Sequence, residues 1–195
     1  LAGLRRRLAE RADLATVAQE ATELLVDLRA ASSERARLIS RAAAVPQRLA
    51  DLAEREQAVR DLADRCRQRV VQTPRLGIPD VSSLEPPPPL DDLQRLPFTA
   101  LRGTVNPMVA KLDRLGDALA EAERRFREPL TRRDELRGLL QAFRDKAAAR
   151  GHGEHRELEP MYRAAADVLW SAPSDLAAAA PLVDAYVRRV NEVTA

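Results

Sequence analysis

Apolar residues recur at alternating steps of three and four over a long first stretch of the chain, from Leu14 to Val70. This spacing predicts one long α-helix over residues 1–72, with a narrow apolar stripe that a second helix must cover. Pro46 lies inside the stretch, and because the register continues across it, we expect a kink rather than a break. The first stripe comprises Leu14, Val17, Ala21, Leu24, Leu28, Ala31, Leu38, Ala42, Val45, Leu49, Leu52, Val59, Ala63, Cys66 and Val70.

A second stripe with the same spacing predicts a second long helix over residues 107–150. Asn106 is the expected N-cap of this helix, Pro107 its first helical residue and Gly151 its stop signal. Pro129 predicts a second kink. The stripe comprises Leu101, Val105, Met108, Leu112, Leu115, Leu119, Ala122, Phe126, Leu136, Leu140, Phe143 and Ala147.

Three polar residues interrupt the two stripes. Arg35 and Glu56 lie in the first stripe, and Arg133 lies in the second. A polar residue in such a stripe can fix the register of a helix pair at some loss of stability. The spacing does not indicate what these three side chains contact.

A connector rich in proline separates the two predicted helices, over residues 73–106. It contains the run Pro86–Pro89, and a short helix is expected within residues 90–104. Four consecutive prolines can dock on an aromatic groove of the SH3 or WW type. The alternative, which we favour, is a semi-rigid strap that lies along the helices.

Two stripes of this kind predict an antiparallel pair of helices within one chain. If Val70 lies opposite Val105, Pro46 lies opposite Pro129, so both helices bend at the same level. Residues 151–195 predict a helical hairpin that covers the first helix between about Leu4 and Leu25. The predicted fold is therefore all-α and a single elongated domain, with a long antiparallel two-helix coiled-coil stalk and a small helical bundle at the end that holds both termini.

The composition excludes several classes of function. The chain has 195 residues, with 32 Lys and Arg against 30 Asp and Glu, and the two signs are interleaved. This distribution predicts solvated helix faces rather than a nucleic-acid site, which would also need exposed aromatic residues. Cys66 is the single cysteine, so no disulfide can form within the chain. No apolar run is long enough to span a membrane.

Catalytic chemistry has few candidate residues. His152 and His155 are the two histidines, and Glu154 and Glu157 are close in sequence, so a divalent metal site is conceivable there. No further Cys or His completes a tetrahedral site, and chance histidines in an exposed loop are the favoured interpretation. Phosphate-binding, dinucleotide-binding and nucleophile motifs are absent from the sequence. We therefore expect no catalytic residue, no metal and no cofactor.

Residues 132–187 contain the run Arg132–Leu140, then Tyr162 and Ala165, and then the run Ala172–Leu176. These residues resemble a helical module of actinobacterial GlnX-type proteins, which are associated with the serine/threonine kinase PknG. The resemblance implies that the chain relays an amino-acid nutrient signal to such a kinase. The candidate partner-binding residues in this stretch are Arg132, Arg133, Glu135, Arg137, Tyr162, Trp170 and Asp175.

We expect a non-enzymatic signalling or adaptor domain that presents a helical surface to a protein partner, a PknG-type kinase being the one that the resemblance implies. The expected location is the cytoplasm, as the soluble part of a membrane protein, and the expected state is a monomeric hairpin or a homodimer. The alternative is a structural coiled-coil protein of cell division or envelope organisation, which self-associates through the same stripes.

Overall fold

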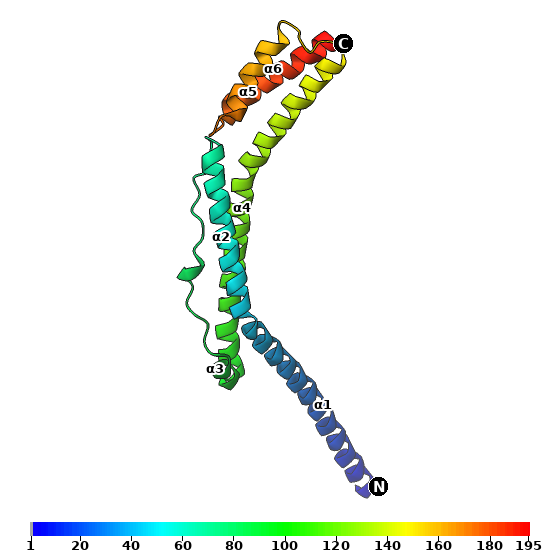
Figure 1. The fold of residues 1–195 in the computed structure, drawn as a ribbon. Coiled ribbons are helices and arrows are strands. Elements are labelled where there is room, and N and C mark those ends of the chain that lie inside the picture. Colours follow the sequence, from blue (N-terminus) through cyan, green and yellow to red (C-terminus); the bar gives the residue numbers. More distant parts are fainter. Residues whose placement is uncertain (1) are drawn as a thin grey trace. The chain divides into compact units, whose positions relative to one another are not determined.

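The computed structural model describes residues 2–195, with side chains for residues 13, 14 and 16–195. The described chain is all-α, as predicted, and its residues outside the helices form connecting segments with one isolated bridge between Val70 and Ser174 (Figure 1). The elements are α1 (Ala2–Ala43), α2 (Val45–Arg69), the 3-10 helix η1 (Val81–Ser83), α3 (Leu90–Arg95), α4 (Phe98–Ala149), α5 (Leu158–Trp170) and α6 (Leu176–Thr194).

The first long helix is interrupted at Ala44, two residues before Pro46. Proline has no backbone N–H, so Pro46 cannot donate to the carbonyl of Ala42. The hydrogen bonds on either side are kept: the Ala44 N–H donates to Ser40 O at 3.2 Å, and the Arg48 N–H donates to Ala44 O at 3.1 Å. The interruption is therefore confined to one turn.

The second long helix begins at Phe98, nine residues earlier than the sequence predicts, and continues through both Pro107 and Pro129. Asn106 is not its N-cap. This side chain lies within α4, and its Oδ1 atom accepts a hydrogen bond from Arg41 Nη1 at 2.9 Å. Asn106 and Pro107 do not mark a helix start here. A proline inside a helix removes one backbone hydrogen bond, and the other contacts of α4 keep the helix continuous.

Internal contacts divide the chain into two compact units. The first unit comprises Leu1–Leu49 and Glu85–Asp113, and the second comprises Ala50–Leu84 and Arg114–Ala195.

In the first unit, α1 and the first residues of α2 run parallel to the beginning of α4. Arg41 bonds to Asn106, and Arg48 forms an ion pair with Asp113, so partner numbers rise together with a constant offset of 65 residues. The predicted antiparallel pairing is therefore wrong, and with it the predicted pairing of Pro46 with Pro129. The 3-4 spacing is the same for either direction, and a connector as long as residues 70–97 allows the chain to return before the next helix begins.

The second unit shows the same direction of pairing. Arg55 Nη2 lies 3.0 Å from Glu123 Oε2, and Leu52 packs against Gly116. Figure 1 shows α2 beside α4, with the colours of both helices advancing in the same direction. The core between them comprises Val59, Leu62, Ala63, Cys66, Ala122 and Phe126.

A small helical bundle is formed by α5, α6 and the end of α4. Its buried residues are Leu136, Leu140, Ala147, Leu158, Ala165, Leu169, Ala179, Val183, Tyr186 and Val190. The bundle predicted at the C-terminus is thus present. Its predicted second role, to cover the first helix between Leu4 and Leu25, is wrong for the described residues, because Leu14 and Leu24 are 68% and 62% exposed. Leu4 lies outside the described side chains.

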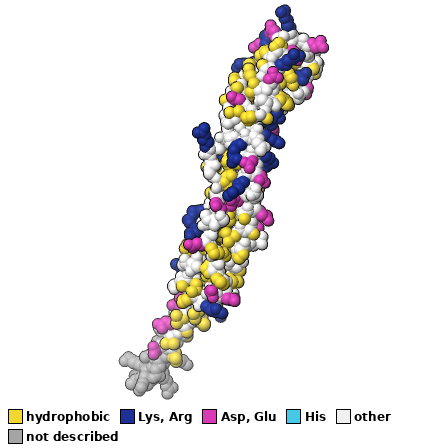
Figure 2. Space-filling view, turned by 60° about the vertical axis from the view of Figure 1, so that its left-hand side comes forward, with side chains coloured by type: hydrophobic (Ala, Val, Ile, Leu, Met, Phe, Trp, Pro, Cys, Tyr) yellow, Lys and Arg dark blue, Asp and Glu magenta, His cyan; other side chains and the backbone are white. Residues whose placement is uncertain are grey.

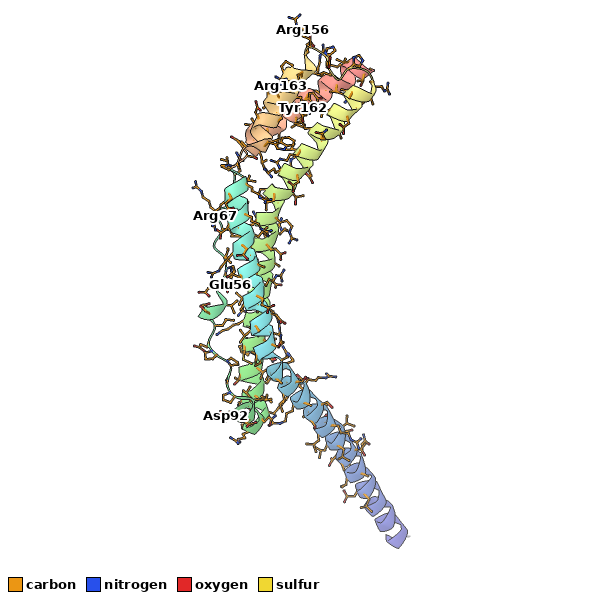
Figure 3. All side chains as sticks on the ribbon, viewed as in Figure 1. Glu56, Arg67, Asp92, Arg156, Tyr162 and Arg163 are labelled. Carbon is orange, nitrogen blue, oxygen red and sulfur yellow. The ribbon has the colours of Figure 1, made fainter. Side chains whose placement is uncertain are left out.

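The three polar residues of the stripes each hold a segment that lies outside the long helices. Arg35 donates to the carbonyl oxygens of Gln94 and Leu96 at the end of α3, the latter at 2.9 Å. Glu56 Oε2 accepts from the N–H of Val81 at 2.8 Å, at the start of η1 (Figure 3). Arg133 donates to the hydroxyl of Ser174, between α5 and α6.

No described helix combines the length and the apolar content that crossing a bilayer requires.

Candidate functional site

The described residues contain no group of three His, Cys, Asp or Glu side chains that could hold a metal ion. His152 and His155 lie in the turn before α5, with ring centroids 6.0 Å apart. The sequence suggested a metal site at these two residues. The described chain brings no third ligand to them.

The shifted pKa values have structural causes. Hydrogen bonds from Arg124 and Arg125 hold the pKa of the Glu121 carboxyl at about 2. Burial raises the pKa of the Cys66 thiol and also that of the Tyr186 hydroxyl. The first of these groups lies on an exposed helix face and the other two lie in the core, so none forms an acid–base pair in a cleft.

Of the seven candidate partner-binding residues, three hold the C-terminal bundle together. Arg133 is buried and bonds to Ser174. Arg137 donates two hydrogen bonds to the carbonyl of Leu169, at 3.0 Å and 2.7 Å, at the end of α5. Asp175 is the N-cap of α6 and accepts from the Ala178 N–H, which lowers the pKa of its carboxyl. Their polar groups are engaged within the chain.

The other four candidates leave more of their surface free. Arg132 and Glu135 form an exposed ion pair at 3.4 Å. Trp170 is half exposed, with the guanidinium of Arg137 4.8 Å from the centre of its ring. Tyr162, on α5, packs edge-on against the buried Tyr186 at 5.9 Å between ring centroids (Figure 3). A role for these residues in partner binding stays a prediction.

Most of the exposed large apolar side chains of the described chain lie on α1, and most of these share one face of this helix. We call it the α1 face, and it comprises Leu14, Val17, Ala18, Ala21, Leu24, Leu25, Leu28 and Ala31. Its Val and Leu side chains are between 53% and 68% exposed. Over Leu14–Leu28 it is about 21 Å long at 1.5 Å per residue. Single exposed leucines are ordinary, but a continuous apolar stripe marks an interaction site.

The α1 face is exposed because α4 begins too late to cover it. The stripe of α1 is buried from Leu38 onward, with Ala42 and Val45. With the offset of 65 residues, Phe98 at the start of α4 lies level with Ser33. The apolar register continues toward the N-terminus beyond that level, without a partner helix from the described chain.

An acidic edge runs along the α1 face. Asp13, Glu20, Asp27 and Glu34 recur every seven residues on one side of the stripe. Residues 13–34 contain five acidic side chains and one basic side chain, Arg29, which gives a net charge of −4 in a chain of net charge +2. Figure 2 shows hydrophobic side chains next to the grey N-terminal end, with acidic side chains beside them.

The sequence contained a signal for this surface. The first stripe is longer than the second, so part of it must lack a partner in the long-helix pair. With the antiparallel direction that the sequence predicts, the C-terminal hairpin would cover that part. With the parallel direction, α5 and α6 pack on the far end of α4, around Leu136 and Leu140.

Comparison with models of protein families, with curated proteins and with solved structures found no match to this chain.

Proposed function

We propose that this chain is a non-enzymatic signalling or adaptor domain, and that its α1 face binds an amphipathic helix of a partner protein. One observation carries the proposal. The apolar register that α4 covers from Leu38 onward continues unchanged through the exposed residues Leu14–Leu28. A helix that continues the position of α4 along α1 buries this face by the same knobs-into-holes packing.

The acidic edge specifies the chemistry of the partner. A helix with Arg or Lys beside its apolar stripe forms ion pairs with Glu20 and Asp27, whereas one with acidic edges is repelled. Charge pairs of this kind select the partner and its orientation more than they add affinity. The partner helix is therefore apolar on one face and basic at its border.

The alternative function is a structural coiled-coil protein that self-associates through the same face. In an antiparallel pair of copies, the acidic edges face each other, with Glu20 close to Asp27 of the second copy. In a parallel pair, Glu20 faces Leu25 and Asp27 faces Ser32, so no opposite charges meet. The acidic edge therefore favours a basic partner over a second copy.

The resemblance of residues 132–187 makes a PknG-type serine/threonine kinase the first natural partner to test, as the receiver of an amino-acid nutrient signal. Purified kinase should be retained by the wild-type chain and lost from the variant Leu24→Gln/Leu28→Gln. If Arg132→Ala and Trp170→Ala abolish retention while the α1 variant does not, the kinase site is on the C-terminal bundle instead.

The direct test uses two fluorescent peptides about three heptads long, with leucine at the stripe positions and either Arg or Glu beside them. We expect the wild-type chain to bind the Arg peptide at least about tenfold more tightly than the Glu peptide, a difference of about 1.4 kcal/mol. Leu24→Gln/Leu28→Gln should abolish binding. Leu139→Gln, a matched change at an exposed leucine of α4, should have no effect.

Failure of the wild-type chain to bind either peptide, or unchanged binding by the α1 variant, overturns the proposal. Light scattering at several concentrations tests the alternative. A mass that rises with concentration, and that Leu24→Gln/Leu28→Gln returns to one chain, supports self-association.

A further inference from the structure

At both ends of residues 84–89, the part of the connector just before α3, the backbone angles match those of a left-handed polyproline II helix. Leu84, at one end, has φ −80° and ψ 135°, and Pro89, near the other end, has φ −53° and ψ 140°. Polyproline II has φ of about −75° and ψ of about +145°, with three residues per turn. The prolines between these two residues have φ fixed in the same range by their rings.

The burial of this segment repeats every three residues, as this helix requires. Leu84 and Pro87 are half-buried, as is Leu90 at the start of α3, whereas Glu85 and the other three prolines, Pro86, Pro88 and Pro89, are exposed. One edge of the polyproline helix therefore faces the protein. The two other edges face solvent, and proline rings form most of their surface.

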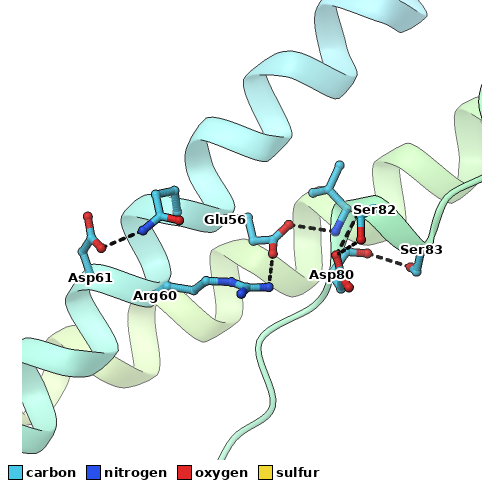
Figure 4. A network of polar contacts seen from close by, with 8 residues as sticks. Glu56, Arg60, Asp61, Asp80, Ser82 and Ser83 are labelled. Atoms are coloured by element: carbon cyan, nitrogen blue, oxygen red, sulfur yellow. Dashed lines mark hydrogen bonds and ion pairs between the residues drawn. The ribbon is translucent and has the colours of Figure 1, made fainter.

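The connector makes hydrogen bonds on both sides of this segment. Before it, the buried Glu56 accepts from the Val81 N–H (Figure 4). After it, Pro89 O accepts from the N–H groups of Asp92 and Leu93 at 3.1 Å and 3.2 Å, which joins the segment to α3. A segment held in its bound conformation loses little conformational entropy when it binds.

The exposed edges have a distinctive chemistry. Proline has no N–H donor, so this segment cannot pair with the edge of a β-sheet through Pro86, Pro88 or Pro89. Proline-rich segments in this conformation dock on grooves lined by aromatic side chains, and they present two edges to the groove. That requirement leaves the third edge, which is the half-buried one here, free to pack against the chain's own helices.

Acidic side chains flank the prolines. Glu85 precedes them, and Asp91 and Asp92 follow at the start of α3, all three exposed. Arg95 lies 3.5 Å from Asp92, in an exposed ion pair. A binding groove that fits this segment therefore has aromatic side chains on its floor and basic side chains at its border.

We propose that Glu85–Pro89 is a ligand segment for a proline-recognition domain with an aromatic groove and a basic border. The site uses residues other than those of the α1 face, so the two surfaces can act independently. In this arrangement the segment is a strap on one edge and a ligand on the other two.

The experiment titrates the full chain into purified SH3, WW and EVH1 domains, each labelled with ¹⁵N, and follows the indole N–H signals and the amide signals of the aromatic groove by NMR. Pro86→Ala/Pro89→Ala removes the two rings of one exposed edge. Pro97→Ala, an exposed proline outside the run, is the matched control. Thermal unfolding shows that the variants fold, and exposed positions should leave it unchanged.

We expect at least one domain to show shifts confined to its aromatic groove, with binding at least about tenfold weaker for Pro86→Ala/Pro89→Ala and unchanged for Pro97→Ala. Glu85→Ala should weaken binding at low salt and have less effect at high salt. The proposal is overturned if none of the three domains shows groove shifts, or if the double variant binds as well as the wild-type chain.

Discussion

The Nε atom of Arg133 donates a hydrogen bond to the Oγ atom of Ser174 at 3.0 Å, and both side chains are buried. Ser174 also joins the loop before α6 to the end of α2: its N–H donates to Arg69 O at 2.8 Å, and its carbonyl accepts from the Val71 N–H at 3.0 Å. One residue between α5 and α6 therefore connects α2, α4 and the C-terminal bundle.

Breaking this pair should destabilise the chain. Ser174→Ala leaves a buried guanidinium without its hydroxyl partner, at an expected cost of about 1–3 kcal/mol in the free energy of unfolding, measured by urea denaturation. Arg133→Met should cost a similar amount, and the double variant less than the sum, because the two residues are coupled. The neighbouring Arg132→Met, at an exposed position, serves as the control. Additive costs in the double variant contradict the coupling.

The parallel direction of α2 and α4 can be tested by cross-linking in a Cys66→Ala background. Arg48→Cys/Asp113→Cys should be joined efficiently by a short bis-maleimide, because these side chains form an ion pair. Asp61→Cys/Arg114→Cys is the control. An antiparallel register would place these two residues opposite each other, whereas the observed pairing separates them by about 13 residues along α4, or ~20 Å. Efficient joining of the control pair, and not of the first pair, refutes the parallel direction.

Glu56 should determine how firmly the connector is held. It is 8% exposed, accepts from the Val81 N–H and forms an ion pair with Arg60, while Asp80 accepts from Ser82 at the start of η1 (Figure 4). Glu56→Ala leaves the Val81 N–H without an acceptor, which should cost about 1–3 kcal/mol.

The measurement for Glu56 is limited proteolysis, scored by cleavage between residues 74 and 84. Glu56→Ala should be cut faster than the wild-type chain, and Glu56→Gln less so, because an amide oxygen still accepts from Val81. Glu54→Ala, an exposed position on the same helix, provides the comparison. Equal cleavage rates in Glu54→Ala and Glu56→Ala contradict a role for Glu56 in holding the connector.

Cys66 should react slowly with iodoacetamide in the folded chain, because it is buried and burial raises the pKa of its thiol. We expect alkylation at pH 8 at least about tenfold slower than in urea. Above the ordinary thiol pKa of about 8.5, the unfolded chain loses this proton while the folded chain keeps it. The contribution of Cys66 to stability should therefore fall as pH rises through that value, and Cys66→Ala should remove this part of the pH dependence. A wild-type alkylation rate equal to that in urea is incompatible with a buried thiol.

The exposed and buried parts of the α1 stripe should respond differently to substitution. Leu38 is fully buried, so Leu38→Ala should cost about 2–5 kcal/mol. Leu24→Gln/Leu28→Gln should change the free energy of unfolding by less than about 0.5 kcal/mol, since both side chains are exposed in the free chain and glutamine is a comparable helix former. A large loss of stability in the second variant means that the chain itself covers the α1 face.

Much of the local structure could be predicted from the sequence. The stripes that contain Leu38 and Leu112 follow a period that belongs to the helix itself, so their residues are buried where a partner helix is present. The start of α4 was misplaced because Asn106 and Pro107 form a strong local cap signal, and the side chain of Arg41 uses Asn106 for a contact between helices instead. The seven candidate partner-binding residues lie in the stretch that carries the family resemblance, and three of them hold the C-terminal bundle together.

Helix period, capping and proline effects act over a few neighbouring residues, so the long helices and their single apolar stripes could be predicted from the residues alone. Three-dimensional packing set the direction in which the helices pair, because a 3-4 stripe is the same in both directions. It also decided which part of the first stripe stays exposed, since that depends on the level at which α4 begins. Packing also joins Arg35, Glu56 and Arg133 to Leu96, Val81 and Ser174, which lie between 25 and 61 residues away along the chain.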